Sequence, residues 1–221
     1  MKKIWAIVPA GGEGTRFGKK KQFERLWGQP ILLHTLEKFT HLLGLEGVVV
    51  AVPENDIPLT RELLLPLPKK IKIVAGGRER QDSVYQAFLT LPPCEIVVVH
   101  DAVRPLVRRE TIEKVIQTAG EVGACIVGTR VKETTKRVDT TGRVLETVAR
   151  DSLWSIQTPQ AFQYSLLKRA FQKAVADRFT GTDEAMLVER LGAPVQVIEG
   201  DSTNIKITTP GDLVLAEAMK S

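Results

Sequence analysis

Residues 4–22 read IWAIVPAGGEGTRFGKKKQ, in which a short apolar run passes directly into a glycine-rich, basic loop. The continuous apolar run of residues 4–9 is typical of a strand that is buried on both faces of a parallel sheet. Gly11, Gly12 and Gly14 then allow the backbone to turn tightly and to approach a ligand closely. Successive N–H groups in such a loop form a concavity that binds anions. The segment therefore predicts a phosphate-binding loop at the end of a buried strand.

Two common phosphate-binding loops can be excluded by the spacing of these residues. The P-loop requires glycine five residues before the Gly-Lys pair and Ser or Thr after it, but Glu13 and Lys20 stand at these positions around Gly18 and Lys19. The dinucleotide-binding fingerprint requires a third glycine where Phe17 stands. The loop therefore belongs to another class of nucleotide site.

Two cations follow these glycines, and they suit attack on the α-phosphate of a nucleoside triphosphate. Negative charge builds on the phosphate oxygens in that reaction, and a fixed guanidinium and ammonium stabilise it. We expect Arg16 and Lys21 to have this catalytic role. The alternative interpretation is a glycine turn beside a solvated basic surface.

The rest of the chain alternates apolar, β-branched runs with segments of helical period. We expect strands at Ile4–Pro9, Val48–Val52, Ile71–Ala75, Glu95–His100, Ala124–Thr129 and Pro194–Ile198, and helices at Pro30–Leu43, Asp82–Leu91, Arg109–Val122, Tyr164–Asp177, Thr182–Leu191 and after Pro210. This order predicts an α/β fold, a Rossmann-like and mostly parallel sheet flanked by helices. The length of 221 residues suits a single domain over residues 1–221.

Residues 131–150 interrupt that alternation. The stretch VKETTKRVDTTGRVLETVAR is polar, rich in Thr and Val, and has a turn sequence at residues 140–142. This pattern predicts a protruding β-hairpin arm. Open edge strands are commonly covered by pairing with another chain, so we expect the arm to make the contact of a homodimer.

The net charge of +5 lies entirely in residues 1–30, which hold seven basic and two acidic residues, whereas the remaining 191 residues hold 24 of each sign. A local excess beside a glycine loop suits a compact polyanion, and aromatic side chains that could stack bases are few at 5%, so we expect no nucleic-acid partner. No apolar run is long enough to span a membrane, and no signal peptide is evident. Cys94 and Cys125 are most simply reduced thiols, and we expect a cytoplasmic protein without membrane association.

Two other loops follow predicted strands and carry candidate site residues. Residues 76–84, GGRERQDSV, offer a glycine pair and a helix start that Asp82 or Ser83 can cap. Residues 100–105, HDAVRP, lie at the carboxyl end of a strand, where ligands bind in open α/β sheets. There Asp101 could hold Mg²⁺ and Arg104 could bind an anionic substrate in a bidentate fork, the alternative being a salt-bridged strand end.

Residues 6–18 (AIVPAGGEGTRFG), followed by KKQF, resemble the opening signature of the sugar-nucleotide pyrophosphorylase and cytidylyltransferase superfamily. The similarity extends over nearly the whole chain and is closest to the 2-C-methyl-D-erythritol 4-phosphate cytidylyltransferase family. Lys20 stands where that family usually has proline, Arg78 where it often has an acid, and Val103 is a mild change in HDAVRP. The resemblance implies a cytidylyltransferase that transfers CMP from CTP to a small polyol phosphate and releases pyrophosphate.

The resemblance also implies roles for individual residues. The nucleotide would be bound by Pro9, Ala10, Gly11, Gly12, Glu13, Gly14, Gly77 and Ser83. Asp101 would lie near Mg²⁺ and the acceptor, which would be positioned by Arg104, Arg150, Lys206 and the hydroxyl of Thr158. Thr134 and Lys136 would reach across a dimer. An acceptor phosphate is already ionised, so the reaction needs no strong general base.

Two rival functions remain open at this point. Ribitol-5-phosphate cytidylyltransferase resembles the same fold and loops, although residues 135–137 (TKR) and the Leu153-Trp154 pair favour the methylerythritol enzyme. A nucleotide-sensing module that has lost catalysis is the other, and the presence of Arg16, Lys21 and Asp101 together argues against it.

Overall fold

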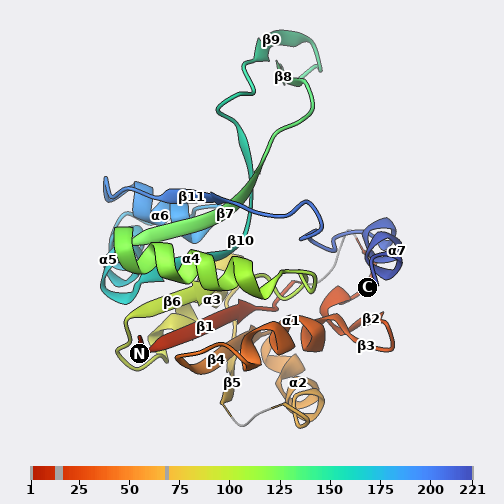
Figure 1. The fold of residues 1–221 in the computed structure, drawn as a ribbon, viewed down its shortest axis with the longest axis vertical. Coiled ribbons are helices and arrows are strands. Elements are labelled where there is room, and N and C mark those ends of the chain that lie inside the picture. Colours follow the sequence, from red (N-terminus) through yellow and green to blue (C-terminus); the bar gives the residue numbers. More distant parts are fainter. Residues whose placement is uncertain (1, 13–16, 68–69, 221) are drawn as a thin grey trace.

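The computed structural model describes residues 2–12, 17–67 and 70–220. A seven-stranded sheet with the order β11-β7-β10-β6-β1-β4-β5 forms its centre (Figure 1). The strands are β1 (Ile4–Pro9), β4 (Leu45–Val52), β5 (Ile71–Ala75), β6 (Ile96–Val99), β7 (Ala124–Arg130), β10 (Trp154–Gln163) and β11 (Gln196–Glu199). All neighbouring pairs are parallel except those of β10, which runs antiparallel to both β6 and β7. The predicted α/β fold with a mostly parallel sheet is confirmed.

Helices cover both faces of the sheet. They are α1 (Ile31–Thr40), α2 (Ile57–Leu63), α3 (Arg80–Leu89), α4 (Arg109–Val122), α5 (Tyr164–Ala176), α6 (Glu184–Glu189) and α7 (Pro210–Ala218). Side chains of α1, α2 and α4 share one apolar cluster with one set of alternate strand residues, and those of α3, α5 and α6 share another with the opposite set. This double burial explains why β1, β4 and β6 are continuous apolar runs in the sequence.

A smaller cluster closes one end of the molecule. Leu26, in the short hairpin of β2 (Arg25–Leu26) and β3 (Gln29–Pro30), packs with Ile31, Phe17, Val103, Ile207 and Ala216 of α7. Two turns of 3₁₀-helix, Lys21–Phe23 and Glu54–Asp56, lie next to this end of the sheet. The C-terminal helix therefore packs against the segment that follows the glycine-rich loop.

The sequence did not predict β10, which is inserted between β6 and β7. Pro159 lies inside it and cannot donate to a strand ladder, so its sequence does not read as a central strand. The pairing with β7 accommodates the proline by a register shift between Gln157 and Gln160. The short elements α2, β2 and β3 were also not predicted.

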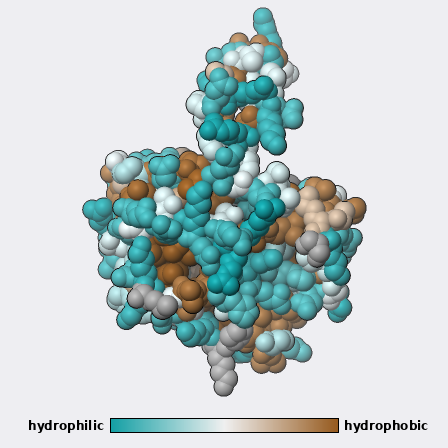
Figure 2. Space-filling view, viewed as in Figure 1, coloured by the Kyte–Doolittle hydropathy of each residue, from teal (hydrophilic) through white to brown (hydrophobic). Residues whose placement is uncertain are grey.

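The predicted hairpin arm is present and projects from the body of the protein (Figures 1 and 2). Its strands β8 (Thr135–Val138) and β9 (Val144–Val148) pair antiparallel around a turn in which Gly142 has a φ of +86°. Most of the arm is hydrophilic, but Val138, Val144 and Leu145 are exposed, the last at 59%. In the described part of the chain, no helix is both long and apolar enough to span a membrane.

Candidate active site

A cavity of about 640 Å³ opens at the carboxyl ends of β1, β4, β5 and β6. The strand order reverses between β1 and β6, because β4 and β5 lie on one side of β1 and β6 lies on the other. Ligands of open α/β sheets bind at such a switch point. The cavity is lined by many of the predicted site residues, namely Pro9, Ala10, Gly11, Gly12, Lys21, Gly77, Ser83, Asp101 and Lys206.

The first part of the glycine-rich loop is held close to the sheet. The N–H of Ala10 donates to the carbonyl of Ala51 at 2.7 Å, and the buried side chain of Gln22 donates to the carbonyl of Ala10 at 2.9 Å. Both bonds fix the backbone that faces the cavity. The predicted site residues Glu13, Gly14 and Arg16 lie outside the described residues.

The lysines at positions 19–21 have different surroundings in the fold. The ammonium of Lys19 lies 2.7 Å from the carboxylate of Glu24, and that of Lys20 lies 2.6 Å from the buried carboxylate of Asp56. Lys21 lines the cavity. Lys20, which stands where the family usually has proline, is therefore anchored by an ion pair to the 3₁₀ turn at Glu54–Asp56.

The loop after β5 brings the second glycine pair to the cavity. A Cβ atom on Gly77 would lie 2.2 Å from the Cβ of Asp82, so glycine is required there by the close approach of the chain. Ser83 accepts from the N–H of Gly77 at 3.1 Å, and Asp82 accepts from the N–H of Glu79. The prediction that Asp82 or Ser83 is the N-cap is wrong, because Glu79 holds that position and Asp82 closes its capping box.

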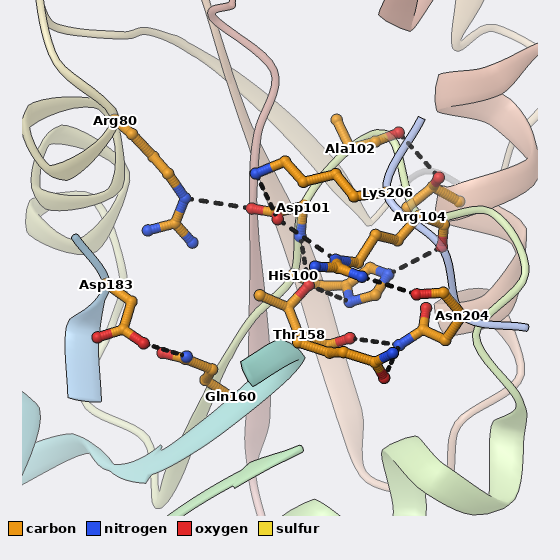
Figure 3. A network of polar contacts seen from close by, with 12 residues as sticks. Arg80, His100, Asp101, Ala102, Arg104, Thr158, Gln160, Asp183, Asn204 and Lys206 are labelled. Carbon is orange, nitrogen blue, oxygen red and sulfur yellow. Dashed lines mark hydrogen bonds and ion pairs between the residues drawn. The ribbon is translucent and has the colours of Figure 1, made fainter. Parts of the chain in front are cut away.

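Asp101 is a buried carboxylate among three cations (Figure 3). Its Oδ1 accepts from Nε of Arg80 at 3.1 Å, and its Oδ2 lies 2.9 Å from Nζ of Lys206 and 3.5 Å from Nε of Arg104. Burial alone would raise the pKa of Asp101, but these cations hold it far below its usual value. The carboxylate is therefore ionised throughout the physiological range.

The hydrogen bonds that are buried behind Asp101 allow only one assignment of donors and acceptors. The N–H of Asp101 donates to Oγ1 of Thr158 at 3.0 Å, and Oγ1 lies 3.0 Å from Nδ1 of His100. Nε2 of His100 lies 3.1 Å from the carbonyl of Arg104, which can only accept. A neutral His100 must therefore carry its proton on Nε2, and the hydroxyl of Thr158 donates inward to Nδ1. Burial lowers the pKa of His100 to about 4, which keeps the ring neutral.

A second cavity of about 240 Å³ adjoins the first and shares Arg80, Asp101 and Lys206 with it. Arg104 and Thr158, both predicted to position the acceptor, also line this cavity. Among the described residues, neither cavity is lined by Thr134, Lys136 or Arg150, which are exposed on the arm or at its base. One chain therefore brings together only part of the predicted acceptor site.

Three residues of the site were not predicted. Arg80 bridges Asp101 and the buried Glu184. The backbone carbonyl of Asn204 accepts from Nη1 of Arg104 at 2.7 Å, while its side chain donates to the carbonyl of Thr158. In the sequence, Arg80 is one of several charged residues in 76–84, and Glu184 lies near the start of the helix expected at Thr182–Leu191. No sequence signal links residues that lie 104 positions apart.

The donor set fits a magnesium ion that is held mainly by a nucleotide. Within the described ranges, no group of three or more His, Cys, Asp or Glu residues could hold a metal ion. Mg²⁺ commonly takes one or two carboxylates together with phosphate oxygens and water. Asp101, which is ionised and lines the cavity beside the glycine loop, is the residue that would supply such a carboxylate.

A family model described as 2-C-methyl-D-erythritol 4-phosphate cytidylyltransferase (IspD) matches residues 4–221. The chain belongs to this family. The cytidylyltransferase of Bacillus velezensis is 44% identical over 218 residues, covering 96% of this chain and 94% of the relative. That of Syntrophus aciditrophicus is 44% identical over 222 residues, covering 98% and 95%.

Solved structures of the cytidylyltransferase family have the same fold. The 4-diphosphocytidyl-2C-methyl-D-erythritol synthase of Anaerococcus prevotii matches with a TM-score of 0.88 at 31% identity, over 98% of this chain and 95% of that one. The cytidylyltransferase of Thermus thermophilus matches with a TM-score of 0.82 at 33% identity, over 98% of each chain. The resemblance predicted from residues 6–18 is thereby confirmed over almost the full length of the chain.

The burial of neutral His100 predicts acid sensitivity of the fold. Its pKa is about 4 in the folded protein and near 6.5 in the unfolded chain, so the unfolded state binds the proton more tightly. Stability is therefore fully present above pH 6.5 and falls as the pH drops toward 4, by on the order of 3 kcal/mol. Urea unfolding at pH 7.5 and pH 4.5 should show this loss in the wild type and a much smaller one in His100→Gln. The exposed-site variant His41→Gln should retain the full loss.

Proposed function

We propose that the protein transfers CMP from CTP to 2-C-methyl-D-erythritol 4-phosphate and releases pyrophosphate. Membership of the cytidylyltransferase family supports this reaction. The single structural observation that carries it is the junction of two cavities at Asp101, Arg80 and Lys206. A nucleoside triphosphate and an acceptor phosphate can meet there with cations between them.

The proposed reaction is one in-line displacement. The loop of residues 9–12 and Lys21 holds the triphosphate, while Gly77 and Ser83 hold the cytosine and ribose. Arg104 and Lys206 hold the acceptor in the adjoining cavity. An oxygen of the acceptor phosphate attacks the α-phosphorus, and the bond from that phosphorus to the bridging oxygen of pyrophosphate breaks.

Stabilisation of charge is the main contribution of this chain to the proposed reaction. Charge grows on the α-phosphate oxygens and on the leaving pyrophosphate, and Lys21, together with Arg16 of the same loop, would stabilise it electrostatically. Mg²⁺ held by Asp101 and the nucleotide would neutralise part of the triphosphate charge.

The proposal does not require a general base. The attacking oxygen belongs to an ionised phosphate and carries no proton that must be removed. The histidine nearest to Asp101 supports this view, because His100 is buried and both of its ring nitrogens are engaged. We also propose that the reaction takes place in the cytoplasm.

We further propose that two copies of the chain complete one site. Thr134, Lys136 and Arg150 would position the acceptor phosphate in the partner's cavity. Supporting this, the arm carries exposed apolar side chains that a second copy would cover, and Lys136 and Arg150 lie on exposed parts of it. Nζ of Lys136 donates to Oγ1 of Thr147 across the arm, which places this lysine on the exposed surface of the hairpin.

Pyrophosphate release is the direct test of the reaction. Purified protein with CTP and Mg²⁺ should release pyrophosphate when 2-C-methyl-D-erythritol 4-phosphate is added, and not when ribitol 5-phosphate is added. Release with ribitol 5-phosphate alone would overturn the acceptor and keep the chemistry. Binding of CTP without release with either acceptor would favour a nucleotide-sensing module.

Replacement of Lys21 by alanine tests the proposed role of this lysine in catalysis. Removing a cation that stabilises transition-state charge should lower kcat by about 10²- to 10³-fold. Lys19→Ala is the matched control, since Lys19 is 62% exposed and pairs with Glu24, and its kcat should stay within about twofold of the wild type. Equal losses in the two variants would contradict a specific role for Lys21.

A charged residue on the arm tests the dimer. Leu145→Asp places a carboxylate on the apolar part of the arm and should convert a dimer to a monomer in sedimentation experiments, with a loss of activity of more than tenfold. Leu65→Asp, at a residue 76% exposed on the body, is the control and should remain a fully active dimer. A wild type that sediments as a monomer and is active would contradict the shared site.

A further inference from the structure

Arg80, the first residue of α3, joins a fully buried carboxylate to the cavity. Nη1 of Arg80 lies 3.0 Å from both carboxylate oxygens of Glu184, the first residue of α6. Nε of the same guanidinium donates to Oδ1 of Asp101 at 3.1 Å, as Figure 3 shows for the Arg80–Asp101 bond. The guanidinium therefore spans two acids that come from separate elements.

Burying the carboxylate of Glu184 is energetically unfavourable, and a role in stability alone does not account for it. Its side chain is 1% exposed, and burial raises its pKa. The ion pair with Arg80 lowers the pKa and so opposes this effect. Burial likewise opposes the charge of Arg80, but Glu184 and Asp101 together raise its pKa. A buried ion pair is often no more stabilising than apolar residues of the same size, so this pair is weak evidence for a role in stability alone.

The two oxygens of Asp101 are held in different ways. Oδ1 is bonded to Arg80, which is itself fixed from the interior by Glu184. Oδ2 is contacted by Lys206, whose side chain is 37% exposed and lines the cavity, and by Arg104 at a longer 3.5 Å. A ligand that draws Lys206 toward a phosphate would uncover Oδ2 and leave Oδ1 in place.

We propose that Glu184 and Arg80 are positioning residues that fix Oδ1 of Asp101, so that Oδ2 is the oxygen presented to magnesium-bound CTP. This inference rests on the proposed function. Without the Glu184 carboxylate, the guanidinium would be drawn onto Asp101 alone and would compete with the metal for its oxygens. Loss of partners that orient a metal ligand commonly lowers metal affinity or activity by about 10- to 100-fold.

Calorimetric titration of CTP with and without Mg²⁺ tests the proposal independently of turnover. The wild type should bind CTP more tightly with Mg²⁺ than without it, and the ratio of the two affinities is the gain. In Glu184→Gln this gain should be at least about tenfold smaller, while the CTP affinity without Mg²⁺ is unchanged. Arg80→Lys, which keeps a cation but not the two-sided bond, should lose the gain as well. Glu184→Asp keeps the charge and should recover part of it.

Glu189→Gln is the matched control, because Glu189 is an exposed residue at the other end of α6 and loses the same charge. It should keep the wild-type gain. Retention of the gain in Glu184→Gln, or equal weakening of CTP binding with and without Mg²⁺, would overturn the proposal. A wild type that binds CTP with a magnesium-dependent gain but transfers no CMP would instead overturn the proposed function, and the two failures are distinguishable.

Discussion

The ionised carboxylate of Asp101 is the constraint on which the rest of the site depends. Three cations reach it from α3, from the turn after β6 and from the segment before α7. Without that carboxylate they would repel one another inside a partly buried space. Counting Glu184, the cluster has three positive and two negative charges, so it is nearly neutral in the free protein and retains an attraction for phosphate.

The topology of the sheet explains how these groups meet. Parallel strands end at the same edge, so the loops after β1, β5 and β6 converge although they are far apart in sequence. The strand β10 runs antiparallel to β6 and places Thr158 where its hydroxyl accepts from the N–H of Asp101. His100, Thr158 and the Asp101 N–H form a chain of hydrogen bonds with fixed direction, which holds the inner side of the turn that carries Asp101 and Arg104.

The parts of the fold that sequence could predict are those with local signals. The strand β1 and the helix α4 were predicted with the bounds that the structure shows, since both faces of the strand and one face of the helix are apolar. The strand β10 was not predictable, because its proline and its register shift have no periodic signature. For the site, Lys21, Asp101 and Lys206 could be predicted from motifs. The link from Glu184 through Arg80 could not, because it depends on how the tertiary fold brings the start of α6 next to the start of α3.

The lysine run shows why a charge excess must be resolved residue by residue. Residues 1–30 carry the whole net charge of +5, which by itself would suit any polyanion. In the folded chain, Lys19 pairs with Glu24 and Lys20 with Asp56, and Lys21 lines the cavity. Basic side chains that line a cavity suit a compact polyanion such as a triphosphate, since a long nucleic acid requires a continuous basic surface to contact many phosphates.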